Sequence, residues 1–288
     1  MKHLINYFMQ KSVMRRVFNL FPLMNSQKIG YPHLVFSFLC LIFMMQAAWS
    51  QESYQAQKHL DLALHYYEDK RFTQALAELE RAQEFAPESP MPHVGIGLVY
   101  AAQGRSGQAI EEMQRALVLQ SDLALAHKEL GNIFWAQRQF QTAEIHYRKA
   151  IALDAKMASA YMGLGLNFAS QRDFANALEQ FQRAIELEPR LPSAYHSLGQ
   201  TYVWMGDLPK AIEAYQTAIQ LEPNNPAPYY ELGVAYMQLK DYPQAVSALE
   251  NAVKLQPRHK SAHYNLAQAY AKIGKPNRAE AETRTFEE

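Results

Sequence analysis

Histidine is the residue of this sequence whose type and spacing come closest to suggesting chemistry. His59, His93 and His127 are each 34 residues apart, and His263 lies four such intervals after His127. Zinc requires imidazole nitrogens at about 2.0–2.1 Å, so several ligands must converge on one ion. Side chains that recur at this spacing instead occupy equivalent places in successive units, and packed helices lie about 8–10 Å apart. The spacing therefore favours histidines packed in a core, and we expect no metal site.

The sequence shows no set of residues arranged for a disulfide framework, for catalysis or for phosphate binding. Cys40 is the only cysteine, which excludes a disulfide framework and a cysteine-based metal site within the chain. No serine, histidine and acidic residues are spaced as a set that a fold would bring together. The glycines fall at repeated positions or turns and leave no phosphate-binding loop. We therefore expect no catalytic residues, no cofactor and no enzymatic activity.

The elements that carry the histidines repeat every 34 residues. Six similar segments recur at this interval: AQEFAPE, ALVLQSD, AIALDAK, AIELEPR, AIQLEPN and AVKLQPR. We number each repeat so that the sixth residue of its segment is position 32. The repeats are then residues 56–89, 90–123, 124–157, 158–191, 192–225, 226–259 and a shortened, capping seventh, 260–288. Such a period is typical of a protein whose units stack on their neighbours.

Two helices are predicted within each repeat. Position 7 is Leu or Ile, position 8 is Gly or Ala, and position 11 is aromatic in every repeat. Position 20 is always Ala, and position 27 is Ala in the first six repeats. Positions 4, 7, 8 and 11 share one face of a first helix, and positions 20, 24 and 27 share one face of a second. All prolines after residue 50 fall in the turns or first helical turns of this scheme.

This pattern resembles the tetratricopeptide repeat (TPR) family. The period, the Leu-Gly pair, the aromatic residue at 11, the alanines at 20 and 27 and the Pro at 32 match over about residues 56–288. The sequence departs at position 4, where the family often has Trp and this chain has His or Tyr. The resemblance implies an all-α fold, a right-handed α-solenoid of tandem helix-turn-helix repeats. It also implies that the first helices line a concave inner face.

This inner face carries the candidate binding residues. Positions 2, 5, 9, 12 and 13 of the first helices point away from the packed stripe, where polar residues are expected. Many are apolar or aromatic here, as a peptide-binding groove requires; the alternative is that curvature of the superhelix buries much of this strip. The candidate partner-binding residues are Leu64, Tyr67, Leu98, Lys128, Asn132, Trp135, Met162, Leu166, His196, Gln200, Trp204, Tyr230 and Val234.

The kind of ligand follows from a comparison with part of the resembled family. Some members hold a C-terminal carboxylate with Lys at position 5 and Asn at position 9, plus basic and Asn residues in the next two repeats. Lys128 and Asn132 match the first pair, but Gly163, Ser193 and Ser197 stand at the later positions. The resemblance therefore favours an apolar or extended peptide.

Residues 1–50 predict an export signal. They contain five Lys or Arg, no acidic residue, an apolar run of 12 from Leu34 to Met45, and small residues near Ser50. We expect cleavage between Ser50 and Gln51. The run is short for a membrane span of roughly 20 residues, but an uncleaved N-terminal anchor facing the periplasm is the alternative. In both cases residues 51–288 leave the cytoplasm for the periplasm or the exterior.

Charge and compartment complete the prediction. The chain has 28 Lys+Arg and 28 Asp+Glu, so removal of five basic residues leaves 23 against 28. This acidic balance argues against nucleic acid as a partner. We predict an exported, non-enzymatic adaptor that binds proteins through its concave groove and contacts a membrane only through an uncleaved signal. The resemblance to bacterial members of this family implies a role in the assembly or export of an envelope structure. The alternatives are an accessory scaffold of a cell-envelope enzyme complex and self-association into a stacked scaffold.

Overall fold

The structure is a computed structural model that describes residues 51–287. The predicted signal segment and its cleavage position at Ser50 lie outside the described residues. Residues from Ala56 onward belong to one structural unit. Throughout the described part of the chain the regular secondary structure is α-helical, which confirms the all-α solenoid predicted from the repeats.

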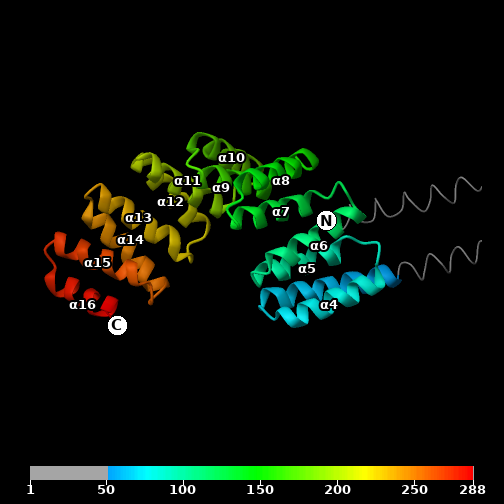
Figure 1. The fold of residues 1–288 in the computed structure, drawn as a ribbon. Coiled ribbons are helices and arrows are strands. Elements are labelled where there is room, and N and C mark those ends of the chain that lie inside the picture. The colour runs from blue at the N-terminus through cyan, green and yellow to red at the C-terminus, as the bar shows by residue number, and fades with distance from the viewer. Residues whose placement is uncertain (1–50, 288) are drawn as a thin grey trace, which may run out of the picture. The chain divides into compact units, whose positions relative to one another are not determined.

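The helices form consecutive pairs, which Figure 1 shows in chain order up to α16 at the C-terminal end. The first helices of the pairs are residues 51–68, α5 (Met91–Ala102), α7 (Ala124–Ala136), α9 (Ala158–Ser170), α11 (Pro192–Met205), α13 (Pro226–Gln238) and α15 (Lys260–Lys272). The second helices are α4 (Phe72–Phe85), α6 (Ser106–Leu119), α8 (Phe140–Leu153), α10 (Phe174–Leu187), α12 (Leu208–Leu221), α14 (Tyr242–Leu255) and α16 (Pro276–Glu287). From α6 to α14, each second helix packs against its own first helix and against the first helix of the next pair, while α4 packs against α5 and α16 against α15.

The turn inside each pair contains one residue with positive φ, at position 15. It is glycine in three pairs, with φ between 72° and 82°, and Lys70, Arg138, Arg172 or Lys240 in the other four, with φ between 59° and 64°. Glycine adopts this conformation freely, whereas another L-residue loses roughly 1–2 kcal/mol in it. Asp173, Asp207 and Asp241 follow three of these residues, and each accepts a hydrogen bond from the backbone N–H three residues later. Aspartate directly before a helix is a common N-cap, because its carboxylate satisfies one of the free N–H groups of the first turn.

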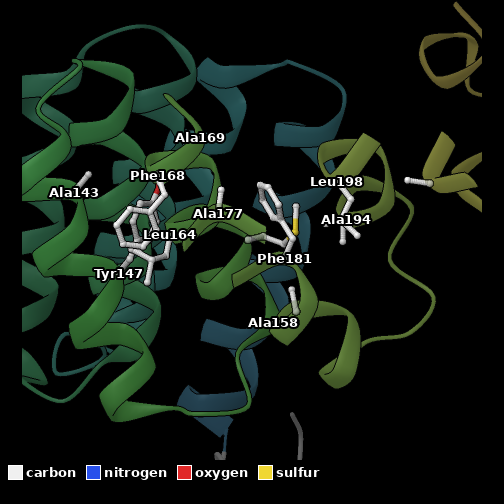
Figure 2. Packing of buried hydrophobic residues seen from close by; sticks show 13 residues of the cluster. Ala143, Tyr147, Ala158, Leu164, Phe168, Ala169, Ala177, Phe181, Ala194 and Leu198 are labelled. Atoms are coloured by element: carbon white, nitrogen blue, oxygen red, sulfur yellow. The ribbon is translucent and has the colours of Figure 1, made fainter. Parts of the chain in front are cut away.

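The core lies where a second helix meets two first helices. The alanines at positions 20 and 27 are fully inaccessible in the first six repeats, and they allow the backbones to approach closely. Position 24 fills the space between them with a larger buried side chain: Leu79, Met113, Tyr147, Phe181, Tyr215 or Leu249. Figure 2 shows Tyr147 beside Leu164 and Phe168 in one part of this core.

Tyr147 has room only because glycines lie on two sides of its ring. A Cβ atom at Gly131 of its own repeat would lie 2.7 Å from the ring. A Cβ atom at Gly163 of the next repeat would lie 2.3 Å from Tyr147 Cε1, which is far inside van der Waals contact. The backbones of α7 and α9 therefore approach a buried aromatic ring directly. Gly163 is explained by this packing between repeats.

Among residues 51–287, the structure contains no helix that combines the length and the apolar character needed to span a membrane.

Candidate functional site

The predicted inner-face residues lie on the first helices, and the structure shows how accessible each one is. Leu64 and Trp204 are more than half exposed, at 57% and 54%. The partly exposed ones are Tyr67, Leu98, Lys128, Asn132, Trp135, Leu166, His196, Gln200, Tyr230 and Val234. Together the two groups form a semi-exposed face that continues from one first helix to the next. We call its apolar members the first-helix face: Leu64, Tyr67, Leu98, Trp135, Leu166, Trp204, Tyr230 and Val234.

Met162 corrects one of these predictions. Its side chain is only 9% exposed and lies in a core cluster with Ala158, Ala194 and Leu198. The neighbouring first helices α9 and α11 contact each other, so a position that faces away from its own second helix is covered by the next repeat. A partner cannot reach this side chain in the folded protein.

Lys128 and Asn132 are engaged within the protein. The Lys128 ammonium forms an ion pair with Glu129, and Asn132 Nδ2 donates to Glu129 Oε2 at 2.8 Å. Tyr147 OH donates to Asn132 Oδ1, also at 2.8 Å. Glu129 is itself buried, so this network satisfies its charge. The two residues that match the carboxylate-binding pair are therefore already bound to a carboxylate of their own helix.

Two repeats later, polar side chains at the corresponding positions lack hydrogen-bond partners. Tyr215 is fully buried, and its hydroxyl has no hydrogen-bond partner within the described residues; the same holds for His196 Nε2. Burial lowers the pKa of His196 and raises the pKa of nearby Glu231, although a hydrogen bond with Gln200 partly opposes the second shift. A buried polar group without a partner costs about 1–3 kcal/mol.

A second feature lies at the edge of the first-helix face, and we call it the turn-edge pocket. It is an open depression of about 540 Å³ whose larger lining residues are Trp135, Arg138, Phe140, Arg172, Phe174 and Trp204. The turns of two consecutive pairs and the end of α11 form it. The two tryptophans are among the binding residues predicted from the sequence, whereas the arginines and phenylalanines are not. The signal for them was present as an Arg-x-Phe sequence repeated 34 residues apart, at Arg138–Phe140 and Arg172–Phe174.

Most position-4 histidines bind a carboxylate on the second helix of their own repeat. Nδ1 of His59, His93 and His263 lies 2.6–2.7 Å from Oε2 of Glu78, Glu112 and Glu282, respectively. His93 and His263 are buried, as the packing argument predicted, and the carboxylate partner is an addition from the structure. No cluster of three His, Cys, Asp or Glu side chains that could hold a metal ion occurs in the described part of the chain.

The third repeat replaces this carboxylate with a second histidine. Nδ1 of His127 lies 3.2 Å from Nδ1 of His146, and their ring centroids are 5.4 Å apart. Burial is the main cause that lowers the pKa of both imidazoles. Lys149 lowers the pKa of His127 further, and His127 lowers that of His146. The folded state therefore resists protonation of this pair.

Acidification is expected to destabilise the wild-type protein through His127 and His146. Because their folded pKa values lie below the ordinary 6.5, the unfolded chain binds more protons, and stability falls as the pH drops through 6.5. The variant His146→Glu would restore the His–carboxylate pair of the other repeats and remove this loss. Urea unfolding of both proteins at pH 7.5 and 5.5 measures the difference. Parallel pH profiles for the two proteins would contradict this explanation.

Comparison with known proteins agrees with the helix pairs. The tetratricopeptide repeat profile matches residues 60–124, 94–158, 128–194 and 230–284, and a second TPR repeat profile matches residues 200–240. No curated protein is similar enough to this chain to count as a relative.

Solved structures share the fold at low sequence identity. The structure of pilF from Pseudomonas aeruginosa is 20% identical with a TM-score of 0.64, and the match covers 77% of this chain and 99% of that one. Yeast Tom70 is 19% identical with a TM-score of 0.60, covering 83% of this chain and 50% of its own. MamA is 23% identical with a TM-score of 0.51, covering 55% and 92%. These likenesses concern the fold. Together with the profile matches over most of residues 60–284, the stacked helix pairs show that the chain belongs to the tetratricopeptide repeat family.

Proposed function

We propose that this protein is a non-enzymatic scaffold that binds a segment of a partner protein along its first-helix face. The observation that carries this proposal is the series of semi-exposed apolar side chains on successive first helices, including Leu64, Leu98, Leu166 and Val234. A solvated helix face is expected to be polar. Covering apolar surface stabilises a complex by about 25 cal/mol per Å² before the costs of association are counted.

The ligand in this proposal is an extended or apolar segment of a partner. Lys128 and Asn132 are held by Glu129 and Tyr147, so their capture of a terminal carboxylate would require breaking a buried network. The partly exposed side chain of Gln200 offers hydrogen-bonding groups farther along the chain, whereas the Tyr215 hydroxyl and His196 Nε2 are buried out of a partner's reach. An extended backbone supplies both donors and acceptors for such groups. This arrangement favours an internal segment of the partner, and not the partner's C-terminal end, as the ligand.

The proposal places the scaffold outside the cytoplasm, in the periplasm or beyond, where it would serve the assembly or export of an envelope structure. Its support is the sequence of residues 1–50, with its basic start, apolar run and small residues before Gln51. An accessory scaffold of a cell-envelope enzyme complex is the second candidate. It uses the same face and differs only in the identity of the partner.

Export is expected to yield a mature chain that begins at Gln51. Expression of the full chain in a Gram-negative host, followed by fractionation and intact-mass measurement, tests this expectation. The mature mass in the periplasmic or secreted fraction supports cleavage. The full mass in the membrane fraction with a protease-accessible solenoid would support the anchor alternative, and the full mass in the cytosol would contradict export.

Self-association by end-to-end stacking is the third candidate, and the C-terminal helix argues against it at that end. The exposed side chains of α16 include Arg278, Glu280, Thr283 and Arg284, so a stacked copy would cover mainly polar groups. Sedimentation of the purified protein over a hundredfold range of concentration tests this. A constant mass supports the scaffold that binds other proteins, and a mass that grows with concentration supports stacking.

Crosslinking in the native envelope fraction, followed by purification and mass spectrometry, tests the proposed function. The scaffold proposal predicts a stoichiometric protein partner whose crosslinked peptide maps to the first-helix face. Activity that appears only when a co-purifying enzyme is present would favour the accessory role.

A further inference from the structure

The turn-edge pocket combines aromatic surface with positive charge. Trp135, Phe140, Phe174 and Trp204 come from three consecutive pairs and line one depression. The rings of Phe174 and Trp204 are 5.8 Å apart and tilted by 31°, and Trp204 is 54% exposed. Aromatic side chains in this arrangement favour the insertion of another ring, since offset and tilted contacts between rings are attractive.

Two guanidinium groups border the same pocket. Arg138 and Arg172 are exposed, and within the described residues neither forms an ion pair. The lining of the pocket contains no Asp or Glu. The planar guanidinium group matches a carboxylate with two parallel hydrogen bonds. The pocket is therefore complementary to an anionic ligand.

The other polar atoms of the lining are already engaged. Trp135 Nε1 donates to Ser170 Oγ at 3.0 Å, and Ser170 Oγ donates to the Leu166 carbonyl at 2.8 Å. An acidic sugar, with a hydroxyl on nearly every carbon, would find few partners beyond the two arginines. A nucleic acid would face a chain whose residues after 50 carry 23 basic against 28 acidic side chains. An apolar ring with one or two adjacent carboxylates fits the lining better.

We propose that the turn-edge pocket binds an acidic peptide segment in which an aromatic side chain lies next to carboxylates. The ring occupies the space between the tryptophans and phenylalanines, while Arg138 and Arg172 bind the flanking carboxylates. This inference rests on the proposed protein-binding function and specifies the chemistry of one end of the binding surface. It adds two arginines and two phenylalanines to the predicted binding residues.

The backbone conformation at the two arginines allows a substitution that changes only the side chain. Arg138 and Arg172 have φ of 61° and 64°, the conformation that Gly104, Gly206 and Gly274 adopt at the same position of other repeats. Replacement by glycine therefore removes the guanidinium group without straining the turn. Lys240 has φ of 62° at the equivalent turn outside the pocket. The variant Lys240→Gly makes the same backbone change and serves as the matched control.

Tryptophan fluorescence of the full chain carrying Trp49→Phe tests this proposal. Trp135 and Trp204 are then the only tryptophans, and both line the pocket. The probe is the terminally blocked peptide Gly-Ser-Asp-Phe-Asp-Ser-Gly, with Asn-Phe-Asn and Asp-Ala-Asp versions for comparison. We expect a saturable change with the first peptide, at least tenfold weaker binding of the other two, and weaker binding as salt rises.

The arginine and lysine variants distinguish binding at the turn-edge pocket from general effects of the substitutions on the protein. Arg138→Gly combined with Arg172→Gly should weaken binding of the Asp-Phe-Asp peptide at least tenfold and leave helicity unchanged, whereas Lys240→Gly should bind it normally. Equal binding of the Asn-Phe-Asn peptide, or normal binding by the double variant, would overturn the proposal. Tighter binding of an oligogalacturonate or a single-stranded oligonucleotide would overturn it as well.

Failure of this inference can be distinguished from failure of the proposed function. The double arginine variant retains Leu98 and Leu166 on the first-helix face, so capture of the native partner can be measured with it separately. Partner capture by a wild-type protein that does not bind the Asp-Phe-Asp peptide would overturn the pocket proposal and leave the scaffold function in place. Unchanged partner capture in first-helix-face variants, with peptide binding intact, would contradict the proposed function and leave the pocket proposal in place.

Discussion

The variant Gly163→Ala is expected to unfold at lower denaturant concentration, with a loss of about 1–3 kcal/mol in the free energy of unfolding. Its Cβ atom would lie 2.3 Å from Tyr147 Cε1. Tyr147 cannot withdraw easily because its side chain is buried, Gly131 lies close to another side of the ring, and its hydroxyl is bonded to Asn132. Urea unfolding followed by circular dichroism measures the change.

Gly107→Ala is the matched control for this prediction. Gly107 is also helical, and a Cβ atom there would meet no atom within 4 Å. Alanine is the better helix former, so this variant should be unchanged or gain up to about 1 kcal/mol. The double variant Gly163→Ala with Tyr147→Leu should recover part of the loss if the clash with the ring is its cause. Wild-type stability of Gly163→Ala would show that Tyr147 does not occupy this position.

Replacing Leu98 and Leu166 with Glu is expected to lower partner capture at least tenfold. Both side chains belong to the first-helix face, and a carboxylate at each position would have to lose water when the partner binds. A pull-down of the native partner from the envelope fraction measures the effect. Because both leucines also touch core residues, the helicity and unfolding of the variant must be measured in parallel.

Two exposed apolar residues on the second helices provide the control for this pair. Val118 on α6 is 87% exposed and Ile145 on α8 is 66% exposed. Their replacement by Glu should leave capture unchanged. Leu64→Glu, at an inner-face position that is 57% exposed, adds a change with little expected effect on stability. Equal losses of capture in the Val118–Ile145 variant and the Leu98–Leu166 variant would contradict binding at the first-helix face.

The sequence was sufficient to predict the fold because each repeat shows the packing pattern independently. A period of 34, the small residues at positions 8, 20 and 27, and the aromatic residue at 11 predict a helix pair that must stack on its neighbours. The capping aspartates could also be assigned, since Asp173, Asp207 and Asp241 directly precede a predicted second helix. These features depend on local geometry that is the same in every repeat.

Contacts between repeats could not be predicted in the same way. Met162 is buried because α11 covers it, and Gly163 is needed because Tyr147 of the preceding repeat lies against it. Both facts depend on the curvature of the stack, which the helical period does not determine. The turn-edge pocket was missed for a related reason. Its residues come from three pairs and only become neighbours after stacking.

The histidine–glutamate pairs could have been predicted from the sequence. In three repeats with His at position 4, position 23 is Glu, and these residues form the pairs of 2.6–2.7 Å. In the repeats with Tyr at position 4, position 23 is Gln or Ala. The two positions vary together within this one chain, which indicates contact between the helices. The exception, His127 with His146, is the place where we expect sensitivity to acid.

Site-specific photocrosslinking in the native host can show whether the first-helix face binds a protein segment. A photoreactive amino acid is placed at Leu98 or Leu166 on this face, and at Val118 or Ile145 on the second helices for comparison. We expect crosslinks to one and the same partner from Leu98 and Leu166, with no such product from Val118 or Ile145. Crosslinks to that partner from the second-helix positions alone would contradict binding at this face.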